Sequence, residues 1–433
     1  MPAFHPSVTL RLPMTARQPP PAAVNGGVAY SVSLNTPSTP LAMPTRVPSA
    51  DFGRQFAQIR EEVLAAMERV CASQHFILGE EVQQFESAAA AFCSPPSIEL
   101  QGIGCASGTD ALWLAMAAAQ LGAQDAVVTT PFSFFATVSS ILRTGSRPLL
   151  ADIDPRTYNL SAPATAALIE NSGASRGTAR IRAILPVHLY GQCADWDGFS
   201  ALQEEFHTLL IEDAAQAFGA QWRGRPAGSL GDLAAFSFYP TKNLSAYGDA
   251  GLVTTGDPAL AERSRMLRTH GMRQRYYHDE VGWNSRLDTL QAAVLLVKLQ
   301  HIDRWNRQRR ELAQNYSEMF RKAGVSDTGV YPEHGVVLPY VDTRGTHVFH
   351  QYVVRVRRRD ALRTFLTERG IGSEIYYPVP LHLQKALHDL GYSDGDFPES
   401  ERAAREVLAI PMFPELTQAE QEQVVAAIAD FLS

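Results

Sequence analysis

The sequence predicts an α/β fold with a mainly parallel central sheet, followed by a smaller C-terminal α+β domain. Between Ala126 and Ile211, short apolar runs alternate with longer helical or turn segments, at residues 126–128, 148–150, 181–185 and 209–211. Short buried strands joined by long connections are typical of βαβ units, whose parallel strands read as nearly continuous hydrophobic runs. The connections are long enough for right-handed crossovers.

Helical spacing flanks this strand region on both sides. From Phe52 to Met67 apolar residues recur at intervals of three and four, which predicts a helix, and a second helix is expected to run through Phe85. Beyond the strand region the pattern predicts one long amphipathic helix from Leu290 to about Gly324, then a strand over residues 351–356 and further helices. This C-terminal part is expected to form the smaller domain.

The chain of 433 residues is long enough for two domains. Residues 1–47 are rich in Pro and contain no Asp or Glu, so we expect them to form a flexible leader, with a targeting segment as the alternative. We expect a large domain over residues 48–300 and a small domain over residues 301–433.

The composition is that of an ordinary soluble globular protein, with 45% hydrophobic and 19% charged residues. A formal net charge of −7 and the lack of a basic patch argue against a nucleic-acid partner, and no apolar stretch is long enough for a membrane span. Cys71, Cys93, Cys105 and Cys193 lie too far apart for a disulfide framework or a zinc site with paired ligands. We therefore expect no bound metal. We expect the protein to lie in a reducing compartment, the cytoplasm.

The glycine-rich residues 102–109 are a candidate anion site. Their third glycine comes one residue too late for a dinucleotide-binding fingerprint, which argues against a nicotinamide-dependent dehydrogenase. The run Ser107-Gly108-Thr109-Asp110 instead indicates the N-terminus of a helix, where backbone N–H groups and a hydroxyl can hold a phosphate. Simple helix capping by Ser or Thr is the structural alternative.

Two further segments carry a carboxylate and an amine. Asp213 follows the apolar strand 209–211, at the strand end where ligands of parallel sheets bind, although a helix cap explains it equally well. Lys242 follows Phe238 and Tyr239, and a lysine in apolar surroundings has a lowered pKa that frees its amine for a Schiff base; an ordinary surface lysine is the alternative. A phosphate site, a carboxylate for a ring nitrogen and such a lysine are together the requirements of pyridoxal 5′-phosphate (PLP).

In these stretches and others the chain resembles the DegT/DnrJ/EryC1/StrS family of PLP-dependent sugar aminotransferases. The matching stretches follow in the expected order at residues 76–79, 106–112, 130–137, 186–191, 212–216, 237–244 and 282–288. The resemblance runs from about Val47 to the C-terminus and implies a fold-type I aminotransferase whose large domain binds PLP. It also implies transfer of an amino group from an amino acid, expected to be L-glutamate, to a keto group of a nucleotide-linked sugar, with 3-keto sugars preferred.

The resemblance assigns roles by position. Lys242 would form the Schiff base and Asp213 would pair with the ring nitrogen, and these two would be the catalytic residues. The implied cofactor contacts are Gln216 at the phenolic oxygen, Phe134 on the ring face, and Gly108, Thr109 and Ser237 at the phosphate. Asn284 would reach the phosphate in the neighbouring subunit, which implies a homodimer with shared active sites. The candidate substrate contacts are His188, Tyr190, Arg273, Tyr377 and His382.

Two rival functions keep the same fold. A PLP-dependent sugar dehydratase would carry histidine in place of Lys242, so the lysine argues against it. A non-catalytic PLP-binding regulator is disfavoured by the complete set of Lys242, Asp213 and Asn284, but the sequence does not exclude it.

Overall fold

A seven-stranded sheet organises the larger part of the fold in the computed structural model, which describes residues 46–172 and 179–433. Its strand order is β1-β9-β8-β5-β4-β2-β3. The strands are β1 (Gln101–Cys105), β2 (Asp125–Thr129), β3 (Arg147–Leu150), β4 (Arg180–Ile184), β5 (Leu209–Asp213), β8 (Leu233–Ser237) and β9 (Gly251–Thr255). Only β9 runs antiparallel to its neighbours, so the expected mainly parallel sheet is confirmed.

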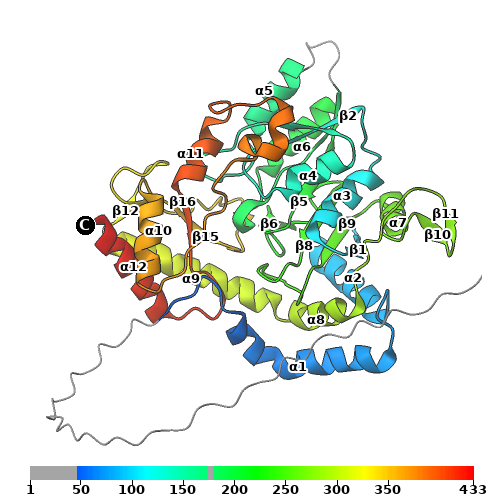
Figure 1. The fold of residues 1–433 in the computed structure, drawn as a ribbon, viewed down its shortest axis with the longest axis horizontal. Helices are drawn as coiled ribbons and strands as arrows, with labels where there is room; N and C mark the ends of the chain where they lie inside the picture. Colours follow the sequence, from blue (N-terminus) through cyan, green and yellow to red (C-terminus); the bar gives the residue numbers. More distant parts are fainter. Residues whose placement is uncertain (1–45, 173–178) are drawn as a thin grey trace, which may run out of the picture. The chain divides into compact units, whose positions relative to one another are not determined.

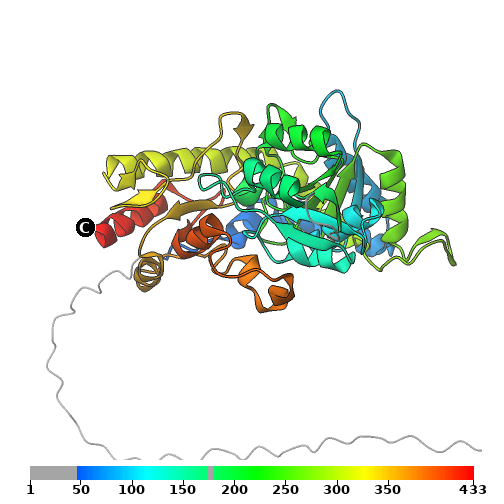
Figure 2. The ribbon, with the colours of Figure 1, turned by 90° about the horizontal axis from the view of Figure 1, so that it is seen from above.

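Alternate residues of each strand supply two hydrophobic cores, one on each face of the sheet, because successive side chains point to opposite faces. Val127, Ala183 and Ile211 pack with α3 (Gly108–Ala118) and α7 (Pro258–Leu267). Val128 and Ile184, one residue further along their strands, pack on the other face. The helices of that face are α1 (Phe52–Ser73), α2 (Glu80–Cys93), α5 (Ala162–Ser172), α6 (Trp196–Phe206) and α8 (Thr289–Leu299). Figures 1 and 2 show this layered arrangement.

The four expected strands correspond to β2, β3, β4 and β5, whereas the pattern does not predict β1, β8 and β9. β1 contains Gly102 and Gly104, a residue type depleted in strands. Both glycines are needed because α2 and a loop approach closely: a Cβ at Gly102 would lie 2.5 Å from the Glu86 carbonyl oxygen, and one at Gly104 would lie 2.8 Å from Leu287 Cδ2.

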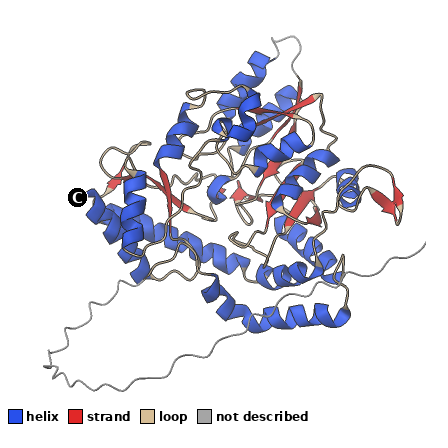
Figure 3. Ribbon diagram, in the orientation of Figure 1, coloured by secondary structure: helices blue, strands red, loops and turns tan. Residues whose placement is uncertain are grey.

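A second, four-stranded sheet has its own core. Its order is β12-β13-β15-β16, and its strands are β12 (Ser326–Asp327), β13 (Val336–Val337), β15 (Tyr352–Arg355) and β16 (Val407–Ile410). It packs with α9 (Ile302–Lys322), α10 (Arg359–Glu368) and α12 (Gln418–Leu432). β15 coincides with the expected strand at 351–356. Figure 3 shows the two groups of strands separated by helices.

The prediction of a single long helix from Leu290 to about Gly324 is wrong. The chain turns at Gln300 and His301, so α8 and α9 are separate helices. The division has a physical reason, because α8 packs wholly against the core of the seven-stranded sheet while the later turns of α9 bury Tyr316 and Phe320 in the second core.

The described chain begins within the last residues of the expected leader, whose residues 1–45 lie outside the description. Val47 is fully buried in the second core. Its backbone N–H donates to the Gly370 carbonyl at 3.0 Å, and its carbonyl accepts from Gly372 at 2.8 Å.

The remaining elements connect these layers. They are α4 (Ala136–Arg143), β6 (Gln221–Trp222), β7 (Arg225–Pro226), β10 (Met272–Gln274), β11 (Tyr277–His278), β14 (Gly345–Thr346), α11 (Pro398–Glu406) and the 3₁₀ turns η1 (Leu189–Gly191), η2 (Leu381–Leu383) and η3 (Lys385–Leu390). The β10–β11 hairpin projects away from the rest of the fold in both ribbon views (Figures 1 and 2). No helix in the described ranges is both long and apolar enough to cross a lipid bilayer.

We expect substitution of Arg355 by Met to destabilise the fold strongly. Arg355 is 1% exposed, and its Nε and Nη2 donate to Glu406 Oε2 at 3.0 and 2.6 Å. The substitution leaves a partly buried carboxylate without its partner, which costs about 3–5 kcal/mol in comparable buried pairs. Urea unfolding followed by circular dichroism measures the loss. The control is Arg273→Met, whose ion-pair partners are exposed; equal effects of both substitutions would contradict the interpretation.

Candidate functional site

A cavity of about 470 Å³ lies at the carboxyl ends of β5 and β8 and at the N-terminus of α3. Asp213 ends β5, Ser237 ends β8, and Lys242 lies in the turn after β8. The C-terminal part of the chain closes the cavity with residues 350–351 and 376–377. Carboxyl ends of parallel strands are the usual ligand site of such sheets, because the connecting loops converge there.

Lys242 presents its amine to this cavity. The turn is held by a hydrogen bond from its N–H to the Tyr239 carbonyl at 2.8 Å. Burial lowers the pKa of Lys242 to about 8, and the Asp213 carboxylate opposes this shift. A lysine with such a pKa has a substantial unprotonated fraction in mildly alkaline solution, so it can act as a nucleophile or a base.

Asp213 is 3% exposed, and burial raises its pKa above the ordinary value. The interactions that oppose this rise most strongly are a hydrogen bond from Thr137 Oγ1 at 2.7 Å, a backbone N–H from Ala215 at 3.3 Å, and the charge of Lys242. Thr137 in turn shares a 2.8 Å hydrogen bond with Ser133. The structure thus holds a buried carboxylate in a fixed orientation at the bottom of the cavity.

The N-terminus of α3 forms an anion-binding corner. Ser107 caps the helix by accepting a hydrogen bond from the Asp110 N–H at 3.1 Å, so the capping expected as a structural alternative is present. Gly108 and Thr109 line the cavity in the first turn, where N–H groups have no intrahelical acceptor. Ser237 lies against them, because a Cβ at Gly108 would come within 2.4 Å of Ser237 Cβ.

Phe134, Gln216 and Tyr377 complete the wall. Phe134 is 58% exposed, and its ring centroid lies 6.1 Å from that of Tyr377. Gln216 donates from Nε2 to the Tyr377 hydroxyl at 3.1 Å and accepts the Tyr190 N–H at 2.6 Å. Burial raises the pKa of Tyr377, so its hydroxyl stays protonated. An anion corner, a buried carboxylate, an aromatic face and an amine with a lowered pKa around one cavity fit the group expected from the sequence, PLP.

Several expected contacts lie elsewhere. His188 is fully buried, its Nε2 lies 3.0 Å from Glu212 Oε2, and its Nδ1 accepts the Ala194 N–H at 3.1 Å, so it has no ring nitrogen left for a substrate. His382 is 2% exposed and bound to Glu401 at 3.1 Å. Both histidines lie outside the cavity lining. His382 Nδ1 has no hydrogen-bond partner among the described residues, so the substrate contact expected of His382 stays a prediction.

Tyr190, Arg273 and Asn284 also lie outside the cavity lining. Tyr190 is buried behind Gln216, and its hydroxyl donates to the Tyr376 carbonyl. Arg273 lies on β10 and forms ion pairs with Glu262 and Asp279. Asn284 is exposed.

His350 and Gln351 are lining residues that sequence reasoning missed. Burial and the charges of Lys242 and Arg309 lower the pKa of His350 well below its usual value, so the ring is neutral. Its Nδ1 lies 3.2 Å from Asn243 Oδ1. No local signal marks these residues, because only the tertiary fold brings them to Lys242.

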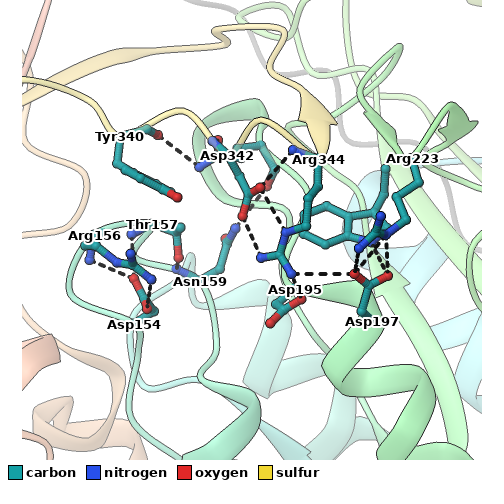
Figure 4. A network of polar contacts seen from close by, with 12 residues as sticks. Asp154, Arg156, Thr157, Asn159, Asp195, Asp197, Arg223, Tyr340, Asp342 and Arg344 are labelled. Atoms are coloured by element: carbon teal, nitrogen blue, oxygen red, sulfur yellow. Dashed lines mark hydrogen bonds and ion pairs between the residues drawn. The ribbon is translucent and has the colours of Figure 1, made fainter.

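A network of charged residues holds the segment that leads to His350 (Figure 4). Arg344 binds Asp342 at 2.7 Å and Asp195 at 3.0 Å. The Asp342 N–H donates to Gln192 Oε1 at 2.8 Å, and Gln192 Nε2 donates to the Tyr340 carbonyl at 3.1 Å. These contacts attach residues 340–344 to the loops beside the seven-stranded sheet, which positions the following residues at the cavity.

Comparisons with known proteins identify the same family as the resemblance in the sequence does. The model of the DegT/DnrJ/EryC1/StrS aminotransferase family matches residues 57–429. A pleiotropic regulatory protein of Geobacillus stearothermophilus is 46% identical over 89% of this chain and 98% of its own. A UDP-N-acetyl-3-dehydro-alpha-D-glucosamine 3-aminotransferase of Acidithiobacillus ferrooxidans is 40% identical over 89% of this chain and 96% of its own. The crystal structure of DesV from S. venezuelae superposes with a TM-score of 0.82 at 39% identity, covering 90% of this chain and 99% of that one.

The lowered pKa of Lys242 predicts an unusual labelling profile. In protein freed of bound small molecules, acetylation of Lys242 should rise as the pH passes through about 8, because the reactive free amine increases with pH. Peptide mass spectrometry, with exposed Lys322 as the reference peptide, measures it. In Asp213→Asn the midpoint should move to lower pH, because a carboxylate that favours the charged amine is gone. A midpoint near the ordinary lysine value of 10.5 would contradict the assigned environment.

Proposed function

The chain belongs to the DegT/DnrJ/EryC1/StrS aminotransferase family, and on that premise we propose that it transfers an amino group from L-glutamate to the keto group of a nucleotide-linked sugar. The observation that carries the proposal is the presence of Lys242 and Asp213 in one cavity with an anion corner. The name of the Acidithiobacillus relative supports a sugar acceptor that carries its keto group at carbon 3.

The residues of the cavity would hold PLP as follows. The N–H groups of Gly108 and Thr109 and the Ser237 hydroxyl would bind its phosphate, and Phe134 would cover the ring face. Asp213 would pair with the ring nitrogen, Gln216 would lie at the phenolic oxygen, and Lys242 would form the Schiff base. When bound, PLP supplies an electron sink for the carbon that loses its proton.

Lys242 is the proton carrier in this proposal. Once displaced by the amino donor, its Nζ would accept the proton from the donor's Cα and give it up again to the bound cofactor. In the second half of the cycle Nζ would recover a proton from the cofactor and deliver it to the sugar carbon that receives the amine. A pKa of about 8 suits both directions, because a base matched to the working pH is easily protonated and easily discharged.

Asp213 supplies a hydrogen-bonded carboxylate in this proposal. Burial alone would favour the neutral acid, but the Thr137 hydroxyl and the Ala215 N–H donate hydrogen bonds to the carboxylate. A carboxylate held in this way would keep a proton on the ring nitrogen of bound PLP, which would strengthen the electron sink.

We propose a homodimer with shared active sites. Asn284 is exposed outside the cavity of its own chain, beside Trp283 at 37% and Val281 at 83% exposure. Large apolar side chains exposed together are typical of a surface that another protein covers. A second copy of this chain would bring Asn284 to the phosphate corner, as the family resemblance implies.

We also propose a cytoplasmic location and retain the division into domains at 48–300 and 301–433. Cys71, Cys93, Cys105 and Cys193 are all free, which suits a reducing compartment. The two sheets with separate cores support the division, and the cavity draws residues from both parts.

The rival functions differ at identifiable points. A dehydratase of this fold would lack the lysine, whereas Lys242 is present in the cavity. The name of the Geobacillus relative describes a regulatory protein. A regulator that only binds PLP has no need of a proton carrier with a lowered pKa or of a hydrogen-bonded buried carboxylate. The presence of both groups therefore favours a catalytic function over a regulator that only binds PLP.

Substitution of Lys242 by Ala should abolish amino transfer and leave the fold intact. The assay supplies PLP, L-glutamate and a panel of UDP- and dTDP-linked keto sugars, and mass spectrometry detects the amino sugar. Lys322→Ala is the matched control, because Lys322 is exposed at the end of α9. Normal turnover by Lys242→Ala would disprove the proposal.

Replacement of Asp213 by Asn should lower kcat by roughly 100-fold or more, because a fixed charge that stabilises the transition state is lost. The circular dichroism spectrum should not change, since Asn is nearly isosteric and can still accept from Thr137. An Asp213→Asn variant with unchanged kcat would show that another group faces the ring nitrogen.

A further inference from the structure

Asn284 lies between two residues that the rest of the chain holds in place. The Trp283 N–H donates to the Leu267 carbonyl at 2.7 Å, and the Ser285 N–H donates to the Arg268 carbonyl at 2.9 Å. The Ser285 side chain is fully buried. The Asn284 side chain is exposed and forms no hydrogen bond with any other residue in the described ranges. The fold therefore presents this amide outwards on a fixed backbone.

Asp110 attaches Ser285 to α3, the helix whose first turn forms the anion corner. Ser285 Oγ donates to Asp110 Oδ2 at 2.7 Å, and Arg143 Nη1 donates to Asp110 Oδ1 at 2.6 Å. Both carboxylate oxygens of Asp110 are therefore bound by side chains of its own chain. Gly108 and Thr109 line the cavity, whereas Asp110 lies outside its lining. Asp110 thus contacts Ser285 rather than the space proposed for PLP.

The indole ring of Trp283 is also attached to α3. Its centroid lies 4.1 Å from that of Trp113, which belongs to α3. The Arg143 guanidinium lies 4.6 Å from the Trp113 centroid and 5.4 Å from the Trp283 centroid, within the range of cation–π attraction. The side chains on both sides of Asn284 are therefore held against one helix.

We propose that Asp110 and Ser285 are positioning residues that hold Asn284 ready for the PLP phosphate bound in the partner subunit. The inference rests on the proposed function, and within it on the shared active sites. A donor held in its binding orientation loses less conformational freedom on binding, so anchoring strengthens the contact. Each α3 then serves two sites: its first turn binds the phosphate in its own cavity, and Asp110 acts through Ser285 and Asn284 on the other. Loss of Ser285 is therefore felt in the partner's site and not in its own.

The first test measures PLP affinity. The full chain, freed of PLP, is titrated with PLP, and the visible absorption band of PLP bound to Lys242 is the signal. Ser285→Ala should raise the apparent Kd for PLP roughly tenfold or more, because a misdirected Asn284 loses a hydrogen bond to a charged group. Asp110→Ala should weaken binding similarly, since Ser285 then has no acceptor there.

Two further variants serve as controls. Asn284→Ala removes the positioned amide itself and should weaken PLP binding at least as much as Ser285→Ala. Ser400 is also a fully buried serine whose Oγ donates to an aspartate, Asp152, at 2.6 Å, but it lies outside the cavity lining. Ser400→Ala should therefore leave the PLP affinity unchanged. Wild-type affinity in Ser285→Ala would overturn the inference.

Mixed dimers decide on which site Ser285 acts. Two differently tagged chains are purified as a heterodimer in which one chain carries Lys242→Ala, so the visible band reports only the site with the intact lysine. With Ser285→Ala on the other chain, that site receives Asn284 from a chain with intact Ser285, and its PLP affinity should equal that of the unsubstituted protein. With both substitutions on the same chain, the affinity should fall roughly tenfold. The reverse pattern, or equal affinity in both arrangements, would overturn the proposal.

The outcomes separate this inference from the proposed function. The titrations need no amino donor, so they judge the role of Ser285 even if the protein transfers no amino group and the proposed function fails. If Asn284→Ala weakens PLP binding and Ser285→Ala does not, only the positioning inference fails. If Asn284→Ala also binds PLP normally, the shared active sites fail together with it.

Discussion

The site depends on the mutual electrostatic effect of Lys242 and Asp213, which line one cavity. Burial shifts both groups towards their neutral forms, lowering the pKa of the lysine and raising that of the acid. Their mutual attraction limits both shifts, and the Thr137 hydrogen bond further limits that of Asp213. The lysine therefore remains easy to protonate and deprotonate, and the hydrogen bonds to the aspartate favour its charged form, as the two proposed roles require.

The rest of the fold places these two groups and the N-terminus of α3 together. The parallel strands β5 and β8 end at the same edge, so Asp213 and Ser237 face one cavity. The C-terminal part closes it with His350 and Gln351, and the Arg344 network anchors the segment before them. The functional side chains lie at strand ends and on the loops that follow them, and the sheet fixes the distances between them.

Much of this architecture could be predicted from the sequence. Periodicity alone located β2 to β5, and the family resemblance, confirmed by the match over residues 57–429, correctly predicted the fold class, an aminotransferase and PLP as its cofactor. Strand β1 could not be predicted from the hydrophobic pattern, because close packing on α2 requires glycines there. The sequence does not show that His188 and His382 lie outside the cavity lining, because a histidine bound to a buried glutamate has the same local sequence as one that faces a substrate.

The absorption spectrum of the purified, PLP-loaded protein before and after addition of L-glutamate tests the central claim most directly. The account predicts a visible absorption band from PLP bound to Lys242, which glutamate converts to the near-ultraviolet band of the aminated cofactor, with release of one 2-oxoglutarate per site. A stable visible band that L-glutamate and all other amino acids leave unchanged would show that Lys242 and Asp213 do not carry out amino transfer in this protein.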